Sequence, residues 1–248
     1  MFKTAHFCQT PLHYMYSISI KINGLFRSHL FSGLRIPLAL ISFIFLLTQC
    51  NQAQKPVEKR SEQPKLSVDL QKYQRAYFAS GCFWCVEAVY ESVTGVVEVV
   101  SGYSGGDSKD ASYDLVSAGL TDHAESVEIY YDSTIVNYQT LLTVFFDSHD
   151  PTTKDRQGPD SGRQYRSAIF YQNDNQRNEA KVFIDSLDAS GVYKNKIVTE
   201  VSPFLSFHPA EDYHQNYERL NPDNPYVRSV SVPRLKKFQQ KHPELLKK

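Results

Sequence analysis

The sequence predicts one α/β domain in which helices pack on a sheet. Strand-like runs alternate with helical patterns from Tyr73 onward, and glycines stand at several of the crossings between them. The stretch of about 175 residues after Tyr73 has no repeat and no low-complexity tract, and it is long enough to bury one sizeable core. These patterns do not fix the order of the strands.

Two kinds of pattern give the elements in order. Runs rich in β-branched and aromatic residues predict strands at 75–79, 96–103, 124–131, 166–171 and 196–201. Apolar residues at helical spacing predict helices at 83–93, 112–118, 137–149 and 173–189. Asn137 and Asn173 stand where their side chains can cap the helices that follow them.

The charge balance argues against a nucleic-acid binder. Lys plus Arg equals Asp plus Glu, at 27 each, so the chain has no overall basic field for nucleic acid or for an anionic membrane. The first 49 residues nevertheless carry four of the cations and no carboxylate, which leaves 23 cations against 27 anions in the remainder. Without that first segment the protein is mildly acidic.

The apolar run at 36–47 (IPLALISFIFLL) follows Arg27 and Arg35, which is the charge order of a secretory signal. It is shorter than the roughly 20 residues that a membrane span needs. The run ends in Leu47-Thr48-Gln49-Cys50, which resembles a bacterial lipoprotein cleavage box with Gln49 in place of the usual small residue. We expect 1–49 to be an export segment and Cys50 to be lipidated, which anchors an exported, periplasmic or cell-envelope protein. A plain signal peptide or an uncleaved anchor is the alternative.

Composition also suggests the domain boundaries. Residues 50–72 are polar, carry two prolines and offer no apolar face, so we interpret them as a flexible tether. The folded domain is expected at 73–230. A charged C-terminal tail is expected at 231–248.

The chemistry is expected at two neighbouring cysteines. The chain has too few cysteines for a disulfide framework: Cys8, Cys50, Cys82 and Cys85. Cys82 falls at the junction of a strand and a helix, where unpaired N–H groups and the helix dipole favour an anion. We therefore expect its thiol to have a lowered pKa and to be nucleophilic. Cys85 lies one helical turn further on, within disulfide reach, as the partner that would resolve an oxidised Cys82.

Three other interpretations of the cysteine pair compete with a reactive nucleophile. The pair would be half of a zinc site if His123 joined it together with His149 or His214, although no second Cys-x-x-Cys and no His-x-x-x-His is present. It would serve an exported thioredoxin-type disulfide exchanger if Pro203 lay beside it. It would also fit inert core cysteines.

Several ordered motifs between residues 75 and 225 together resemble one enzyme family. They are Gly81-Cys82-Phe83-Trp84, Tyr103-Ser104-Gly105-Gly106, His123-Ala124-Glu125, Asp160, Gln164-Tyr165-Arg166-Ser167 and Ala210-Glu211-Asp212-Tyr213-His214-Gln215. The set resembles the A class of peptide methionine sulfoxide reductases and is far more specific than a lone Cys-x-x-Cys. The resemblance implies a ferredoxin-like α/β roll with a mixed sheet. It also implies reduction of the S epimer of methionine sulfoxide, free or in proteins, without metal or cofactor.

The resemblance implies a role for each matching residue. Cys82 aligns with the nucleophile, Glu125 with the acid at the sulfoxide oxygen, and Phe83 and Trp84 with the wall for the S-methyl group. Tyr113 and Tyr165 align with tyrosines that share that oxygen, and Asp160 with an acidic residue of the same pocket. The family usually has glycine at the position of Cys85, and no cysteine follows Cys85 here. Cys85 is therefore the sole candidate resolver in the mature domain, with a thioredoxin-like dithiol as the external reductant.

The residues themselves allow plainer interpretations beside these roles. Glu125 shares the side of its strand with Val127 and Ile129, and a carboxyl group that aromatics desolvate keeps its proton near neutral pH. From spacing alone it would also fit a solvated edge carboxylate. The other candidates have structural alternatives as well: core tyrosines for Tyr113 and Tyr165, a turn former for Asp160, and structural hydrogen bonding for His214 and Tyr217.

Overall fold

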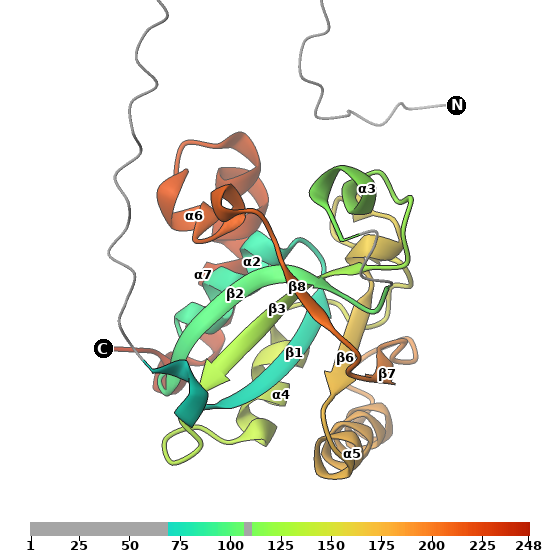
Figure 1. Cartoon of the computed structure of the whole chain (residues 1–248). Coiled ribbons are helices and arrows are strands. Elements are labelled where there is room, and N and C mark those ends of the chain that lie inside the picture. The colour runs from blue at the N-terminus through green and yellow to red at the C-terminus, as the bar shows by residue number, and fades with distance from the viewer. Residues whose placement is uncertain (1–68, 107–110) are drawn as a thin grey trace, which may run out of the picture. The chain divides into compact units, whose positions relative to one another are not determined.

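The computed structural model describes residues 69–106 and 111–248 (Figure 1). The predicted export segment, Cys50 and most of the predicted tether lie outside the described residues. Among the residues described, no helix has the length and apolar character to cross a membrane.

Six strands form one mixed sheet in the order β7-β6-β1-β3-β2-β8. Neighbouring strands are antiparallel except β6 and β7, which run parallel. The six strands are β1 (Gln74–Ser80), β2 (Val96–Ser104), β3 (Ala124–Tyr131), β6 (Ser167–Tyr171), β7 (Glu200–Pro203) and β8 (Phe207–Pro209). A separate two-stranded hairpin joins β4 (Arg156–Gln157) to β5 (Asp160–Ser161). The predicted α/β class, with helices packed on a mixed sheet, is confirmed.

Both faces of the central strand β1 are buried, which explains its apolar sequence. Successive side chains of a strand point to opposite faces. Ala76 and Phe78 belong to the main core under the helices, whereas Tyr77 and Ala79 belong to a smaller cluster on the other face. Phe204 stacks on Tyr77 there, with ring centroids 3.9 Å apart. The sheet is therefore covered on both sides where β1 ends at the cysteine pair.

Four longer helices pack against this sheet or against one another. They are α2 (Phe83–Glu91), α4 (Tyr138–Asp147), α5 (Asp174–Ser190) and α7 (Val232–Lys241). α2 contacts β1, β2 and β3, and α7 packs on α2, as Figure 1 shows. The predicted caps are confirmed: Asn137 Oδ1 accepts from Thr140 N at 2.8 Å, and Asn173 Oδ1 accepts from Gln176 N at 3.0 Å. Short turns complete the unit: η1 (Leu70–Lys72), α3 (Tyr113–Ser117), η3 (Arg163–Tyr165), η4 (Asp212–His214), α6 (Tyr217–Leu220), η5 (Val227–Ser231) and η6 (Pro243–Leu245).

One strand is shorter than the sequence predicts. The run at 196–201 was expected to be extended throughout, but β7 begins only at Glu200. The N–H of Ile197 donates to Asp188 Oδ1 and that of Val198 to Pro151 O, so these groups bond to the end of α5 and to a loop. Their hydrogen bonds satisfy the backbone without a neighbouring strand.

The C-terminal residues differ most from expectation. The region 231–248, predicted to be a charged tail outside the folded domain, instead contains α7 and η6. Phe238 of α7 is fully buried in the main core. A residue further along, Leu246, forms an isolated antiparallel bridge with Val93 after the end of α2. The folded unit therefore does not end at residue 230.

Candidate active site

Cys82 occupies the N-cap of α2, directly after β1 and a tight turn. Gly81 of this turn has a φ of +91°, a conformation that side chains rarely adopt, and an added Cβ would lie 2.7 Å from Gln157 Cβ. The carbonyl of Cys82 accepts the first helical hydrogen bonds, from Cys85 N at 3.1 Å and Val86 N at 3.3 Å. As predicted, the cysteine stands where the free N–H groups of the first turn converge.

Glu125 takes one of these free N–H groups. It lies near the start of β3 with only 2% of its surface exposed, and its Oε2 accepts from Phe83 N at 3.0 Å. Burial raises the pKa of this carboxyl to about 8, against the lowering effect of the Phe83 N–H. The edge-carboxylate interpretation is therefore wrong, and Glu125 is a neutral acid near pH 7, next to the residue that follows Cys82.

The two aromatic residues after Cys82 are held by the C-terminal segment. Phe83 is buried, and its ring centroid lies 5.0 Å from that of His214. Trp84 stacks on Tyr217 at 3.7 Å with 7° between the planes. Its Nε1–H donates to His214 Nδ1 at 3.1 Å. Burial lowers the pKa of His214 to about 4, so this imidazole is neutral and keeps Nδ1 as an acceptor.

Tyr113 and Tyr165 reach the same region from separate elements. The N–H of Tyr113, at the start of α3, donates to Glu211 Oε1 at 3.1 Å, and its ring lies 4.4 Å from that of His214. Tyr165 ends η3 and is partly buried. Burial raises the pKa of its phenol, and the charges of Glu125 and Cys82 raise it further, because both groups lie close. Tyr165 therefore keeps its phenolic proton at neutral pH and can donate a hydrogen bond.

Asp160 is tied to a tyrosine that the sequence analysis missed. It begins β5, and its Oδ2 accepts from Tyr226 OH at 2.5 Å. The same hydroxyl lies 3.9 Å from Cys85 Sγ, and the Tyr226 ring meets the Trp84 ring edge-on at 6.0 Å. Burial raises the pKa of Asp160, opposed by Tyr226 and then by Arg234. Tyr226 therefore links the acidic residue, the aromatic wall and the second cysteine.

The two thiols share their ionisation unequally. Both are free, with 8% of Cys82 and 2% of Cys85 exposed. Burial raises the pKa of Cys82 well above its ordinary value, so the prediction of a lowered pKa there is wrong for the resting dithiol. The hydrogen bond from Cys82 lowers the pKa of Cys85 to about 7, with Arg234 acting in the same direction and burial against both. Of the two interacting thiols, Cys85 therefore ionises at a lower pH than Cys82.

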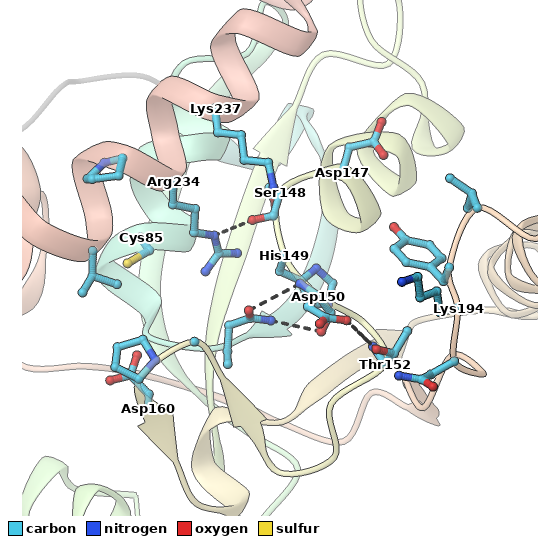
Figure 2. Close-up of a pocket in the computed structure, with 18 of the residues that line it drawn as sticks. Cys85, Asp147, Ser148, His149, Asp150, Thr152, Asp160, Lys194, Arg234 and Lys237 are labelled. Atoms are coloured by element: carbon cyan, nitrogen blue, oxygen red, sulfur yellow. Dashed lines mark hydrogen bonds between the residues drawn. The ribbon is translucent and has the colours of Figure 1, made fainter. Parts of the chain in front are cut away.

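A cavity of about 670 Å³ opens on the Cys85 side of the pair. Cys85, Asp160, Tyr226 and Arg234 are among the residues that line it, as Figure 2 shows for the three that it labels. Of the predicted substrate residues, Asp160 lines this cavity, whereas Phe83, Trp84, Tyr113 and Tyr165 do not. The cavity therefore borders Cys85 and Asp160 and reaches the aromatic wall only through Tyr226, whose ring contacts that of Trp84.

Two of the three histidines proposed for a zinc site are engaged elsewhere. His149 Nδ1 and Nε2 lie at hydrogen-bond distance from Phe145 O (2.6 Å) and Ser167 Oγ (2.8 Å), and His214 is bonded to Trp84. Across residues 69–106 and 111–248, no three His, Cys, Asp or Glu side chains are grouped to hold a metal ion.

The residues that the sequence analysis did not single out come mainly from the C-terminal segment. Tyr226 and Arg234 reach the cysteine pair, and Glu211 joins Tyr103 OH (2.9 Å) to the N–H of Tyr113. The sequence shows that the segment after residue 203 is rich in Tyr, His, Pro and Asn. It does not show that this segment packs near the cysteines. The sequence analysis weighed an individual role only for His214 and Tyr217, and it named Glu211 only as part of a motif.

Sequence comparison assigns this architecture to a family. The family model described as peptide methionine sulfoxide reductase matches residues 74–246. Peptide methionine sulfoxide reductase MsrA 2 of Synechocystis sp. is 50% identical over 175 residues, which cover 70% of this chain and 82% of that protein. MsrA 1 of Rhodopirellula baltica is 47% identical over 172 residues, which cover 69% of this chain and 88% of that protein.

Solved structures agree with the sequence comparison. Reduced Mxr1 from Saccharomyces cerevisiae superposes with a TM-score of 0.56 at 33% identity, over 61% of this chain and 87% of that one. Methionine sulfoxide reductase A of Corynebacterium diphtheriae gives 0.54 at 34% identity, over 60% of this chain and 75% of that one. With its fold, its ordered motifs and most of its folded length in common with these proteins, the chain belongs to the peptide methionine sulfoxide reductase family.

Proposed function

We propose that the protein reduces the S epimer of methionine sulfoxide to methionine by attack of the Cys82 sulfur, and so repairs oxidised proteins. One observation carries this reaction: a buried carboxyl group with a raised pKa, Glu125, is bonded to the residue that follows Cys82. A sulfoxide sulfur is electrophilic only when its oxygen is protonated or strongly hydrogen-bonded. Glu125 supplies that proton at neutral pH.

The first half-reaction transfers oxygen from substrate to enzyme. The Cys82 proton passes along its hydrogen bond to the Cys85 thiolate, and the Cys82 sulfur attacks the sulfoxide sulfur. Glu125 protonates the oxygen, with Tyr113 and Tyr165 as further donors. When the sulfur–sulfur adduct collapses, methionine leaves with two more electrons and Cys82 becomes a sulfenic acid.

The aromatic wall receives the S-methyl group of the substrate. Phe83 and Trp84 lie directly beside Cys82, and the stack on Tyr217 with the bond to His214 fixes the plane of the indole. An apolar wall on one side and oxygen donors on the other distinguish the two epimers, because exchanging oxygen and methyl would place the oxygen against the aromatic rings.

The second half-reaction restores the dithiol. Cys85 attacks the Cys82 sulfenic acid, a disulfide forms and water leaves. An external dithiol of the thioredoxin type then reduces the disulfide by thiol–disulfide exchange. The other function considered, a disulfide exchanger, is not supported: exchange requires neither a buried acid nor an aromatic wall, and the family is that of the reductases.

Turnover of the two epimers of methyl p-tolyl sulfoxide with dithiothreitol tests this proposal. The S epimer should be consumed, while the R epimer and the Cys82→Ser variant show no turnover above background. Equal rates for the two epimers, or activity of Cys82→Ser near that of wild type, would refute the assignment.

We also propose that the protein is exported and held at the membrane by a lipid on Cys50. The support is the order of charges, the apolar run and the cysteine in the first 50 residues. Wild type should then partition with membranes, and Cys50→Ala should be released from them. A soluble wild-type pool in which Cys50 reacts with an alkylating reagent would contradict the anchor.

A further inference from the structure

We propose that Arg234 of α7 is the positioning residue that keeps negative charge on the Cys85 sulfur and so prepares Cys85 to resolve oxidised Cys82. The inference rests on the proposed function, because it concerns the second half of that reaction. It also gives a chemical role to a helix that the sequence presents as a tail.

The guanidinium of Arg234 lies against the turn that carries the cysteine pair. Nη1 donates to Ser80 O at 2.9 Å, Nη2 to Ser80 Oγ at 3.0 Å and Nε to Ser148 O at 2.6 Å. A Cβ added to Gly81 would lie 3.6 Å from Nη1. Arg234 and Cys85 line the same cavity, and Figure 2 shows them beside each other on one wall of it.

The positive charge of Arg234 is not neutralised by its own contacts. Its three acceptors, two backbone carbonyls and a hydroxyl, are all neutral. Within residues 69–106 and 111–248, no carboxylate oxygen lies within 4.0 Å of this guanidinium, whereas Arg166 pairs with Glu200 at 3.1 Å. An unpaired guanidinium at a half-buried site acts more strongly on a neighbouring anion than one screened by water.

Other groups that face Cys85 do not provide this charge. They are Cys82 on its own helix, Glu125 from β3, His149 after α4, Asp160 from β5, Tyr226 and Ser231 around η5, and Lys237 from α7. Burial lowers the pKa of His149 to about 3, so it is neutral. Glu125 and Asp160 are acids, and Lys237 is exposed on the cavity rim. Arg234 is the cation whose hydrogen bonds fix it beside the thiol.

The step that Arg234 assists is balanced within the enzyme. The Cys85 thiolate attacks the Cys82 sulfenic sulfur, the S–S bond forms and the S–O bond breaks. The departing hydroxide takes up the proton that Cys85 received from Cys82 in the first half-reaction and gives up here, so it leaves as water and no further reductant is needed. A lowered pKa of Cys85 keeps the attacking sulfur ionised near pH 7.

The test separates the two half-reactions in single turnovers without reductant. Arg234→Gln removes the charge but keeps an amide donor for Ser80 or Ser148, and Arg234→Lys keeps the charge. Lys236→Gln is the matched control, because Lys236 is exposed on the same helix. Released methionine is measured first, and disulfide formation is then followed by trapping the remaining sulfenic acid at pH 6 to 9.5.

We expect the rates of disulfide formation in wild type and in Arg234→Gln to cross when they are plotted against pH. The charge of Arg234 lowers the pKa of Cys85 less than the hydrogen bond from Cys82 does, so Arg234→Gln should undo only part of the lowering. If the pKa rises from about 7 to about 8, the thiolate fraction at pH 7 falls about fivefold, while the more basic thiolate becomes about threefold more nucleophilic. Disulfide formation in Arg234→Gln should therefore be about twofold slower than wild type at pH 7 and between about two- and threefold faster at pH 9. Arg234→Lys and Lys236→Gln should follow wild type.

Each other outcome counts against the proposal. It is refuted if Arg234→Gln forms the disulfide with the wild-type pH profile, or is slowed equally at every pH, since the role would then be structural. If Arg234→Gln does not fold, the test rests on Arg234→Lys, which keeps the charge. The proposal is supported if the rate of disulfide formation in Arg234→Lys depends on pH as it does in wild type. It is refuted if that dependence is displaced to higher pH. Absence of the methionine burst in wild type would instead refute the proposed function.

Discussion

Glu125 shows at the scale of one residue how function and stability oppose each other. The carboxyl group is 2% exposed, and burial raises its pKa to about 8, far above the roughly 4.3 of an unfolded chain. Between these two values the folded protein binds a proton that the unfolded chain does not. Stability therefore falls as the pH rises through this window, while the proton needed by the sulfoxide stays available up to about pH 8.

Glu125→Gln should separate these two effects. Gln cannot deliver a proton but can still accept from Phe83 N, so the methionine burst should slow by about 100-fold or more. The same variant should gain on the order of 1–3 kcal/mol in free energy of unfolding at pH 7, because a neutral side chain replaces a buried acid. Urea denaturation and quenched-flow methionine release give the two quantities.

The pH profile provides the control for this substitution. The wild-type burst rate should decline as the pH rises through about 8, where Glu125 loses its proton. Glu125→Gln should lack that decline, and the exposed Glu244→Gln should keep it. A burst rate in Glu125→Gln close to that of wild type would show that another group protonates the oxygen.

At the scale of elements, local patterns predicted most of the unit. The alternation of 124–131 gave β3 with its observed bounds, and the two asparagine caps began α4 and α5 where expected. The spacing of Cys82 and Cys85 placed both on the first turn of α2. These features depend on neighbours in sequence, which is why the sequence was sufficient for them.

The C-terminal elements could not be predicted in the same way. α7 is rich in lysine and glutamine, so its composition suggests a solvated tail, yet Leu235 and Phe238 lie on one helical face toward α2. β8 has three residues and depends on Gly102, where an added Cβ would lie 2.4 Å from His208 O. Both elements are stabilised by contacts distant in sequence, which single-sequence patterns do not encode.

Phe238→Ala tests whether α7 belongs to the folded unit. Phe238 is fully buried in the main core, so removing its ring should lower the free energy of unfolding by about 3–5 kcal/mol. The exposed Gln240→Ala on the same helix should change it by less than about 0.5 kcal/mol. If both substitutions lowered the free energy of unfolding by the same small amount in urea denaturation, α7 would contribute no side chain to the core.

At the scale of the whole folded unit, strand order brings the chemistry together. β1 lies between β6 and β3, and Phe78 pairs with Val127, so the end of β1 before Cys82 runs beside the start of β3 at Glu125. The β4–β5 hairpin adds Asp160, and the C-terminal segment adds Tyr226 and Arg234. The sequence analysis named the nucleophile, the acid and Asp160, but not this strand order, and so it missed Tyr226 and Arg234 near Cys85.

The central claim is that this one unit contains both the oxygen acceptor, Cys82, and its resolver, Cys85. The most direct measurement is mass analysis of wild type and Cys85→Ser after exposure to a slight excess of methionine S-sulfoxide without reductant. Both proteins should release about one equivalent of methionine; wild type should carry an 82–85 disulfide, and Cys85→Ser a sulfenic acid on Cys82. Oxidised wild type with both thiols free, or a Cys85→Ser variant that thioredoxin recycles at the full rate, would contradict the account.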